Sequence, residues 1–315
     1  MLMIRMTKQK IIFLLMFSFL LFNTGCEKTK QNLYEQDLTF LNKQVNVKIY
    51  TNSHDKADKI FNDIQTIYNN YELAIKEGNS SSNKKISNEL SNLIETGLEW
   101  YDKSNGLINI NKGNLVDLWN KNKKDKSIPS SSELEHTEIN IDNIKLNNKY
   151  LTGSFNLNFD DFIYGQADKD IKNYLNEMHI KYYFINASDH ILAGSNYDRD
   201  NYNILLSNPF NEEINTITIN NKYIVTKSIY YDSYEYNDSL YSNIVNPITK
   251  ELSNNMISVT VISEDPLEGD ILATILFMSD YDDGYRFANE YNIQAIWYFY
   301  DTNGNEIVKK TKDFR

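Results

Sequence analysis

The chain has 315 residues, enough for one large domain or two small ones, and its formal net charge of −11 gives no electrostatic attraction for nucleic acid. Its hydrophobic content of 41% and aromatic content of 13% indicate a folded protein, and its few Pro and Gly residues exclude collagen-like and Pro-rich classes. A single cysteine excludes an intramolecular disulfide.

The amino terminus has the pattern of a secretory signal. Basic residues precede an apolar run over 11–22, which is shorter than the roughly 20 residues that a membrane-spanning helix needs. Thr24-Gly25-Cys26 follows and resembles a bacterial lipobox, with Asn23 where Leu is usual. We therefore expect a lipoprotein signal peptide at 1–25, a lipid-modified Cys26 and a tether over 26–37, which together anchor the protein to the outer face of the cell membrane.

The domain itself is expected over 38–315. Alternating apolar residues predict a strand at 45–50, and apolar residues at intervals of three and four predict helices at 57–76 and 87–103. The charged, serine-rich stretch 122–137 is interpreted as a variable connection. In the middle of the chain, strands are predicted at 107–111, 139–146, 150–155 and 157–162, and a helix at 167–178.

The second half is dominated by short strands. They are predicted at 182–186, 191–194, 202–206, 215–219 and 223–226, in a tyrosine-rich hairpin at 230–241, and at 295–300 and 306–310. Strands outnumber helices and the two do not alternate regularly. The pattern favours an α+β fold with mainly antiparallel sheets and packed helices in a single domain.

The stretch 257–277 combines a strand, a turn and an apolar helix. Asp270 and Thr274 stand four residues apart, so that a helix places both oxygens on one face, where they could share a hard cation. The alternative is an acidic residue that favours the helix dipole and a threonine bonded to its own backbone. That arrangement is common, and the spacing alone leaves both interpretations open.

Six segments, in the same order, resemble the ApbE family of FAD:protein FMN transferases. They lie at 106–119, 158–175, 186–194, 202–209, 241–249 and 257–278. The last one, ISVTVISEDPLEGDILATILFM, follows the family pattern vsVtviap....aDalsTalfvl. The resemblance implies an ApbE-like domain and a secreted, often lipid-anchored enzyme that uses FAD and Mg²⁺. It implies transfer of the FMN moiety to a Thr or Ser hydroxyl of a partner flavoprotein, with release of AMP.

The resemblance also implies a set of site residues. By position, Asp270 and Thr274 match metal ligands, and Asp161 matches a position that offers a further oxygen, for which its backbone carbonyl would serve. A Mg²⁺ ion there would bridge the pyrophosphate oxygens of FAD. The positions that match flavin-nucleotide contacts are Leu107, Ile108, Asn109, Asn158, Tyr164 and Val245.

Several positions depart from the family pattern. Asp160-Asp161 replaces a Gly-Gly pair, and Tyr164 replaces a Lys. Asn243 replaces a His that could accept the proton of the attacking hydroxyl, and since an amide is no base near neutral pH, Asn243 or a water would position that hydroxyl instead. His190 lies just beyond the turn at 186–189, and a lone His beside a strand is more often a hydrogen-bonded surface group.

Three functions are compatible with this pattern. The first is a Mg²⁺-dependent FMN transferase with FAD as donor and an exported flavoprotein as acceptor. The second is a lipoprotein that binds flavin or a partner and has lost turnover. The third is an FAD pyrophosphatase in which water takes the place of the acceptor hydroxyl.

Overall fold

The computed structural model describes residues 30–79, 83–231, 233–237 and 239–314. The predicted signal peptide and Cys26 lie outside these residues, so lipidation stays a prediction. In the described part of the chain, no helix combines the length and apolar character needed to span a membrane.

The strands have the following bounds: β1 (Asn32–Phe40), β2 (Lys43–Thr51), β3 (Lys84–Lys85), β4 (Ile144–Asn147), β5 (Tyr150–Gly153), β6 (Tyr183–Asn186), β7 (His190–Ala193), β8 (Tyr202–Ser207), β9 (Ile214–Ile219), β10 (Lys222–Ser228), β11 (Tyr234–Tyr236), β12 (Ser239–Tyr241), β13 (Ser258–Ser263), β14 (Gln294–Tyr300) and β15 (Glu306–Lys310). The helices are α2 (His54–Gly78), α3 (Asn88–Lys103), α4 (Gly113–Asp125), α5 (Ser131–His136), α6 (Ile163–Glu177), α7 (Pro266–Met278) and α8 (Tyr281–Glu290), with a 3₁₀ turn at Ile141–Asn143.

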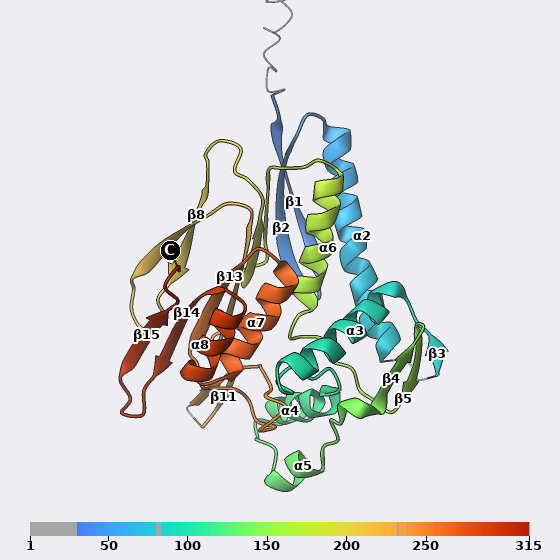
Figure 1. The fold of residues 1–315 in the computed structure, drawn as a ribbon, viewed down its shortest axis with the longest axis vertical. Helices are drawn as coiled ribbons and strands as arrows, with labels where there is room; N and C mark the ends of the chain where they lie inside the picture. The colour runs from blue at the N-terminus through green and yellow to red at the C-terminus, as the bar shows by residue number, and fades with distance from the viewer. Residues whose placement is uncertain (1–29, 80–82, 232, 238, 315) are drawn as a thin grey trace, which may run out of the picture.

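An eight-stranded sheet forms the centre of the fold, in the order β1-β2-β6-β7-β10-β13-β14-β15. Every neighbouring pair in it is antiparallel. Helices α2, α6, α7 and α8 lie side by side across one face, with α2 over β1 and β2, α7 over β10 and β13, and α8 over β14 (Figure 1). The sheet therefore buries one face under a layer of helices.

The β8-β9 hairpin covers part of the opposite face. Successive residues of a strand point to opposite sides, so Tyr223 and Val225 join the core under the helices, whereas Ile224 packs with Ile204 and Ile217 of the hairpin. All six residues of β13 are buried, which fits a central strand enclosed on both faces.

Helix α7 lies at the middle of the helical layer, against α6, α8, β10 and β13. The Asp265 carboxylate accepts hydrogen bonds from the backbone N–H groups of Leu267 and Glu268, and Pro266 occupies the first turn, so the chain enters this helix in a fixed direction. Eleven of its 13 residues are buried, as expected of a helix that is apolar on all sides. The backbone positions of Asp270 and Thr274 on this helix are therefore well defined.

A smaller part of the domain surrounds α3, α4 and α5 together with the three-stranded sheet β3-β5-β4 (Figure 1). Leu115 and Trp119 of α4 pack on Val245, and the Trp119 indole N–H donates to the carbonyl of Lys250 at 2.9 Å. These contacts attach α4 to the loop 242–253 and so fix the position of its first residue.

The predicted fold class is confirmed: the structure is a single α+β domain with mainly antiparallel sheets. The folded part begins before the predicted boundary at 38, since β1 starts at Asn32 and pairs with β2 along its whole length. Leu41 and Asn42 connect these strands with positive φ angles of 50° and 64°, a primed hairpin turn made without glycine.

Other differences concern one predicted strand and three helices. Residues 157–162 form a turn and no strand, and α6 begins at Ile163, four residues before the predicted start at 167. Helix α5 lies inside the stretch interpreted as a connection, where Ser130 and Glu133 form a capping box. Helix α8 was not predicted, and its Asp280 caps the first turn.

Candidate functional site

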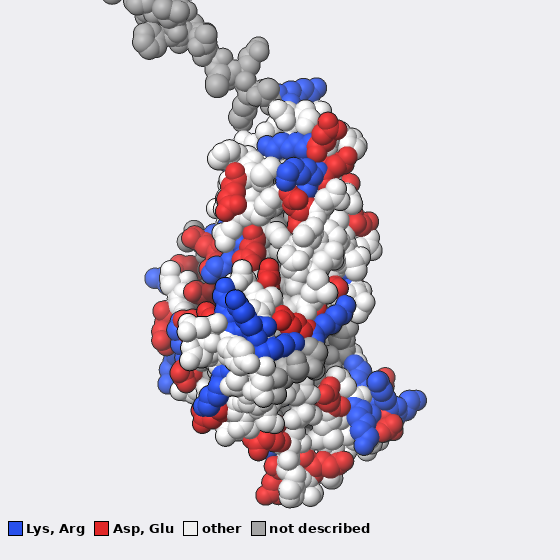
Figure 2. Space-filling model, turned by 90° about the vertical axis from the view of Figure 1, so that its right-hand side faces the viewer, with Lys and Arg blue, Asp and Glu red and all other residues white. Residues whose placement is uncertain are grey.

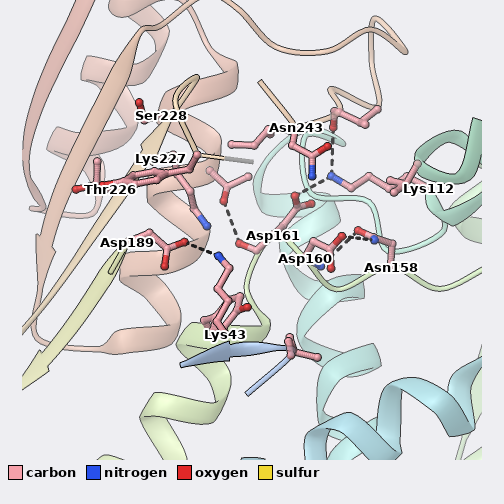
Figure 3. Close-up of a pocket in the computed structure, with 17 residues that line it drawn as sticks. Lys43, Lys112, Asn158, Asp160, Asp161, Asp189, Thr226, Lys227, Ser228 and Asn243 are labelled. Carbon is pink, nitrogen blue, oxygen red and sulfur yellow. Dashed lines mark hydrogen bonds and ion pairs between the residues drawn. The ribbon is translucent and has the colours of Figure 1, made fainter. Parts of the chain in front are cut away.

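A cleft of about 320 Å³ opens where the end of β10, the turn before α6, the start of α4 and residues 243–245 meet. On the face seen in Figure 2, acidic and basic side chains gather around a hollow near the middle of the molecule. Figure 3 shows that the labelled side chains reach the cleft from several segments far apart in the sequence. Three lysines line it, Lys43, Lys112 and Lys227.

Each of these lysines pairs with an aspartate. The ammonium of Lys112 lies 2.7 Å from a carboxylate oxygen of Asp161, and that of Lys43 lies 3.1 Å from Asp189 (Figure 3). The ammonium of Lys227 lies 2.7 Å from Asp270. The cleft thus combines cationic and anionic groups at short range, an arrangement that can bind an anion if it competes with the carboxylates for the ammonium groups.

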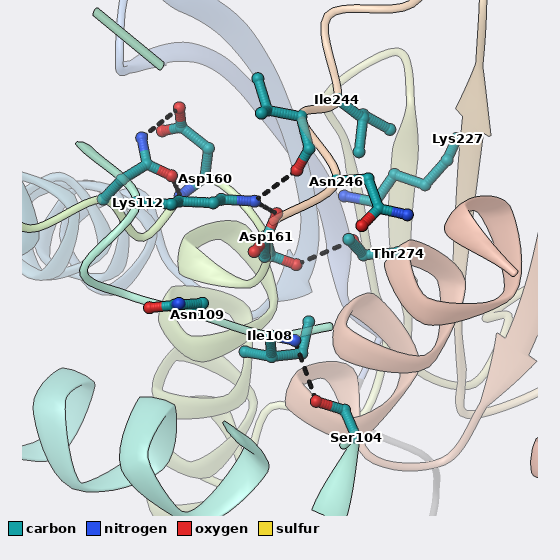
Figure 4. Close-up of polar contacts among 12 residues, drawn as sticks. Ser104, Ile108, Asn109, Lys112, Asp160, Asp161, Lys227, Ile244, Asn246 and Thr274 are labelled. Carbon is teal, nitrogen blue, oxygen red and sulfur yellow. Dashed lines mark hydrogen bonds and ion pairs between the residues drawn. The ribbon is translucent and has the colours of Figure 1, made fainter. Parts of the chain in front are cut away.

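The pair of Lys112 and Asp161 is almost completely buried, with exposed side-chain fractions of 2% and 7%. Lys112 also donates to the carbonyl of Val245 at 3.2 Å (Figure 4). Burial raises the pKa of Asp161, although the charge and hydrogen bond of Lys112 oppose this effect. A lysine at the start of a helix opposes the helix dipole, so its position before α4 depends on these anionic and carbonyl partners.

Asp270 lies directly beneath the cleft on α7. One carboxylate oxygen accepts a hydrogen bond from the backbone N–H of Gly165 at 2.9 Å, and the other lies 2.7 Å from the ammonium of Lys227. The Thr274 hydroxyl lies 3.0 Å from the carbonyl oxygen of Asp161 and 3.2 Å from that of Asp270. The predicted metal ligands are therefore brought together. Of the alternative interpretation, the structure shows the bond from Thr274 to its own helix backbone, whereas the acidic residue in the first turn of α7 is Glu268 and not Asp270.

The donor set does not fit a resident divalent cation. Asp270 already faces an ammonium group and a backbone N–H, and the carbonyl of Asp161 faces the Thr274 hydroxyl. Among the described residues, no group of three or more His, Cys, Asp or Glu side chains could hold a metal ion. A Mg²⁺ ion needs several oxygens in near-octahedral geometry, whereas here the carboxylate of Asp270 faces two nitrogen donors and the carbonyl of Asp161 faces a hydroxyl.

A series of buried polar side chains leads from the cleft toward α2. His190 lies 3.1 Å from Asp189 and 3.5 Å from Asp168, and the Tyr68 hydroxyl lies 3.3 Å from Asp168. The expectation of a surface histidine is wrong, since the His190 side chain is only 4% exposed. Burial lowers its pKa, but Asp189 and Asp168 outweigh this effect and raise the pKa of His190 above its ordinary value.

Two aspartates in this series of polar side chains have opposite pKa shifts. Burial raises the pKa of Asp168 to about 6, against the opposing charge of His190. Burial acts in the same direction on Asp189, but the hydrogen bond and charge of His190 and the charge of Lys43 outweigh it, and the pKa of Asp189 falls well below its usual range. The Asp189 carboxylate is therefore ionised at the rim of the cleft.

The predicted flavin contacts divide into two groups. Asn158, Tyr164 and Val245 line the cleft, as does Asn243. Leu107, Ile108 and Asn109 are not among the described residues that line it, and Figure 4 shows the labelled Ile108 and Asn109 apart from the Lys112-Asp161 pair.

Hydrogen bonds explain the placement of this second group. The N–H of Ile108 donates to the Ser104 hydroxyl at 2.9 Å, and the Asn109 amide donates to the carbonyl of Ile139 at 3.0 Å. Ile108 is fully buried in the main core. Their role as flavin contacts stays a prediction.

Four charged residues that line the cleft were missed by the sequence interpretation: Lys43, Lys112, Asp189 and Lys227. Two of them carry a signal in the sequence. Lys227 interrupts the apolar alternation of its strand on the side that faces the core, and Lys112 stands where a helix begins. Lys43 and Asp189 lie beside turns, where charged residues are common and indicate no particular role.

The sheet and its helical layer form the fold of solved ApbE flavin transferases. The structure of the ApbE protein from Thermotoga maritima aligns with a TM-score of 0.77 at 18% identity, over 90% of this chain and 98% of that one. The flavin transferase ApbE from Vibrio cholerae aligns with a TM-score of 0.73 at 16% identity, over 90% and 99%.

The sequence comparison identifies the family. Residues 41–297 match the ApbE family, and the chain belongs to it. It is similar to an FAD:protein FMN transferase of Klebsiella pneumoniae, at 23% identity over 78% of this chain and 82% of that protein. It is also similar to one of Buchnera aphidicola, at 27% identity over 67% of this chain and 65% of that protein.

Proposed function

We propose that this chain is an FAD:protein FMN transferase that moves the FMN moiety of FAD to a Thr or Ser hydroxyl of a partner flavoprotein and releases AMP. The observation that carries the proposal is the convergence of Lys43, Lys112 and Lys227 in one cleft of an ApbE-family domain. Ammonium groups suit the pyrophosphate of FAD, the part of the donor that reacts.

The reaction exchanges the phosphoanhydride linkage of FAD for a new phosphate ester linkage to the acceptor. The acceptor oxygen attacks the phosphorus of the FMN half, the bridging P–O bond of the pyrophosphate breaks, and AMP leaves with the bridging oxygen. The hydroxyl proton passes to solvent or to the departing phosphate. Negative charge grows on the AMP phosphate as the bond breaks, and a lysine beside it stabilises that charge.

Asn243 is the residue at the cleft that suits the positioning of the acceptor. Its side chain is exposed, lines the cleft and lies beside Lys112 in Figure 3. Its amide can accept a hydrogen bond from the attacking hydroxyl but cannot take the proton near neutral pH. We therefore expect a slow reaction in which the hydroxyl is oriented without a general base.

The Mg²⁺ dependence that the resemblance implies is not part of this proposal. Of the residues named for it, Asp270 faces the Lys227 ammonium and accepts from the Gly165 N–H, and Thr274 donates its hydroxyl hydrogen to the carbonyl of Asp161. In the proposed reaction, the positive charge beside the pyrophosphate comes from the lysines of the cleft.

The location follows from the sequence. A lipid-modified Cys26 would hold the domain at the outer face of the cell membrane, and β1 starts only six residues later. The acceptor is then an exported or membrane-bound flavoprotein with an accessible hydroxyl.

The test is incubation of the full-length protein with FAD and a set of exported flavoproteins, followed by separation of the nucleotides and detection of protein-bound flavin. AMP together with a flavin-labelled acceptor supports the proposal. AMP with free FMN assigns a pyrophosphatase, and intact FAD that stays bound assigns a binding lipoprotein.

A matched pair of variants connects the activity to the cleft. Lys112→Met removes a buried ammonium at the start of α4 and is expected to abolish AMP release. Lys124→Met removes an exposed one near the end of the same helix and is expected to leave AMP release unchanged.

A further inference from the structure

We infer that the ammonium group of Lys227 occupies the place of a divalent cation in this site, so that the chain binds the FAD pyrophosphate without a metal ion. The inference rests on the proposed function for the identity of the ligand. Its first part, the replacement of a metal by a lysine, concerns only the residues of this chain and is tested separately.

The position of Lys227 is the first argument. Its ammonium lies 2.7 Å from Asp270, the residue that the sequence names as a metal ligand, and the two side chains are 13% and 1% exposed. Figure 4 shows Lys227 near Thr274 and Asp161, whose carbonyl accepts a hydrogen bond from the threonine. The lysine thus lies among the oxygens predicted to bind the metal.

The surrounding charges are the second argument. Asp161, Asp189 and Asp270 all act on Lys227. Asp161 and Asp189 each have a second lysine partner within 3.1 Å, and Lys227 is itself the partner of Asp270. The carboxylates are therefore neutralised inside the chain. A divalent cation bound to Asp270 would lie within a few ångströms of the ammonium and be repelled by it.

The rigidity of the strand is the third argument. Lys227 lies on β10, a strand that pairs with β7 over 222–225 and with β13 over 223–228, and Lys227 itself pairs with Val259 of β13. Its backbone is fixed, and its ammonium lines the cleft. Lys222 at the other end of β10 has a different environment, because its partner Glu264 has an 82% exposed side chain.

The experiment measures metal binding and FAD binding on the full-length protein. Mn²⁺ binding is followed by electron paramagnetic resonance without FAD, and FAD binding by flavin fluorescence in EDTA and in Mg²⁺. We expect no stoichiometric Mn²⁺ site in the unmodified protein and less than about a twofold change in FAD affinity on chelation, because the ammonium supplies the charge that a metal would bring.

The variants give the complementary result. Lys227→Ala exposes the Asp270 carboxylate and is expected to gain a Mn²⁺ site, to lose about tenfold or more in FAD affinity in EDTA, and to recover part of it in Mg²⁺. Lys227→Arg keeps a cation and is expected to bind no Mn²⁺. Lys222→Ala is the matched control on the same strand and is expected to behave like the unmodified protein.

Two results overturn the inference. One is a 1:1 Mn²⁺ site in the unmodified protein, and the other is loss of FAD binding on chelation. Both are read on the unmodified protein, so they decide the question even if Lys227→Ala does not fold. If FAD binds neither with nor without metal, the proposed function fails, whereas the Mn²⁺ measurement still decides whether Lys227 holds the cation position.

Discussion

The Thr274 hydroxyl lies 3.0 Å from the backbone carbonyl oxygen of Asp161, although 113 residues separate them in the chain. The contact joins the buried helix α7 to the turn before α6. The side-chain carboxylate of Asp161, in the same turn, forms an ion pair with Lys112. A single hydrogen bond from the most buried helix thus fixes the floor of the cleft.

Thr274→Val removes this hydroxyl and keeps the shape of the side chain. The carbonyl of Asp161 then has no donor from α7, and we expect the free energy of unfolding to fall by about 1–3 kcal/mol. The measurement is urea denaturation. Thr216→Val on β9 is the control, since Thr216 is exposed and its substitution should stay within about 0.5 kcal/mol. Equal stability of the two variants would remove the structural role assigned to Thr274.

Gly165 of α6 allows the close approach of α6 and α7. A Cβ atom there would lie 2.5 Å from the Cβ of Asp270 and 2.6 Å from the carbonyl oxygen of Pro266, far inside contact distance. Gly165→Ala is therefore expected to separate the two helices, to weaken the hydrogen bond to Asp270, and to destabilise the protein by at least about 1–3 kcal/mol.

Gly284→Ala on α8 is the matched control for this prediction. The nearest atom to a Cβ at Gly284 is the Trp297 indole nitrogen at 3.4 Å, an ordinary contact. Alanine is the better helix former, so this variant is expected to be neutral or to gain up to about 1 kcal/mol. Thermal or urea unfolding decides, and an equal loss in both variants would mean that helix spacing at Gly165 is not the cause.

Much of the sheet could be predicted from local pattern. In strands β2, β10 and β14, apolar residues alternate with polar ones or follow one another without interruption. Helices α2 and α3 begin after the capping residues Ser53 and Ser87. Strand β1 could not be predicted, because it is an edge strand with mostly exposed residues whose order comes from pairing with β2. Helix α8 has only ten residues, of which only Gly284 and Ala288 are buried, so its sequence carries little apolar signal.

The site was predictable only in part. The four-residue spacing of Asp270 and Thr274 places both on one side of α7, and periodicity alone establishes this. Which groups face them depends on long-range pairing: Lys227 reaches Asp270 through the register of β10 with β13, and Lys112 reaches Asp161 through the packing of α4. No local pattern encodes either contact.

Asp168 makes stability depend on pH. Its pKa in the folded protein is about 6, above the ordinary 3.8, so between these values the folded state binds more protons than the unfolded state. Stability then falls as pH rises from about 4 to 6, by roughly 3 kcal/mol from this group. Asp168→Asn removes the titration, and urea denaturation at several pH values should show a flatter profile for the variant. Parallel profiles would contradict the assignment.

Asn243→His introduces a group that can accept the proton of the acceptor hydroxyl. The position is exposed at the cleft, so the substitution should not change stability, and the imidazole pKa of about 6.5 suits a base near neutral pH. A positioned base contributes about 10²–10⁴-fold, and we expect at least a tenfold faster release of AMP, with a rate that rises between about pH 5.5 and 7.5. Asn243→Gln keeps an amide and serves as control. If the His and Gln variants release AMP at the same rate as the unmodified protein, proton removal does not limit the reaction, and the slow step lies in FAD binding or in the approach of the acceptor.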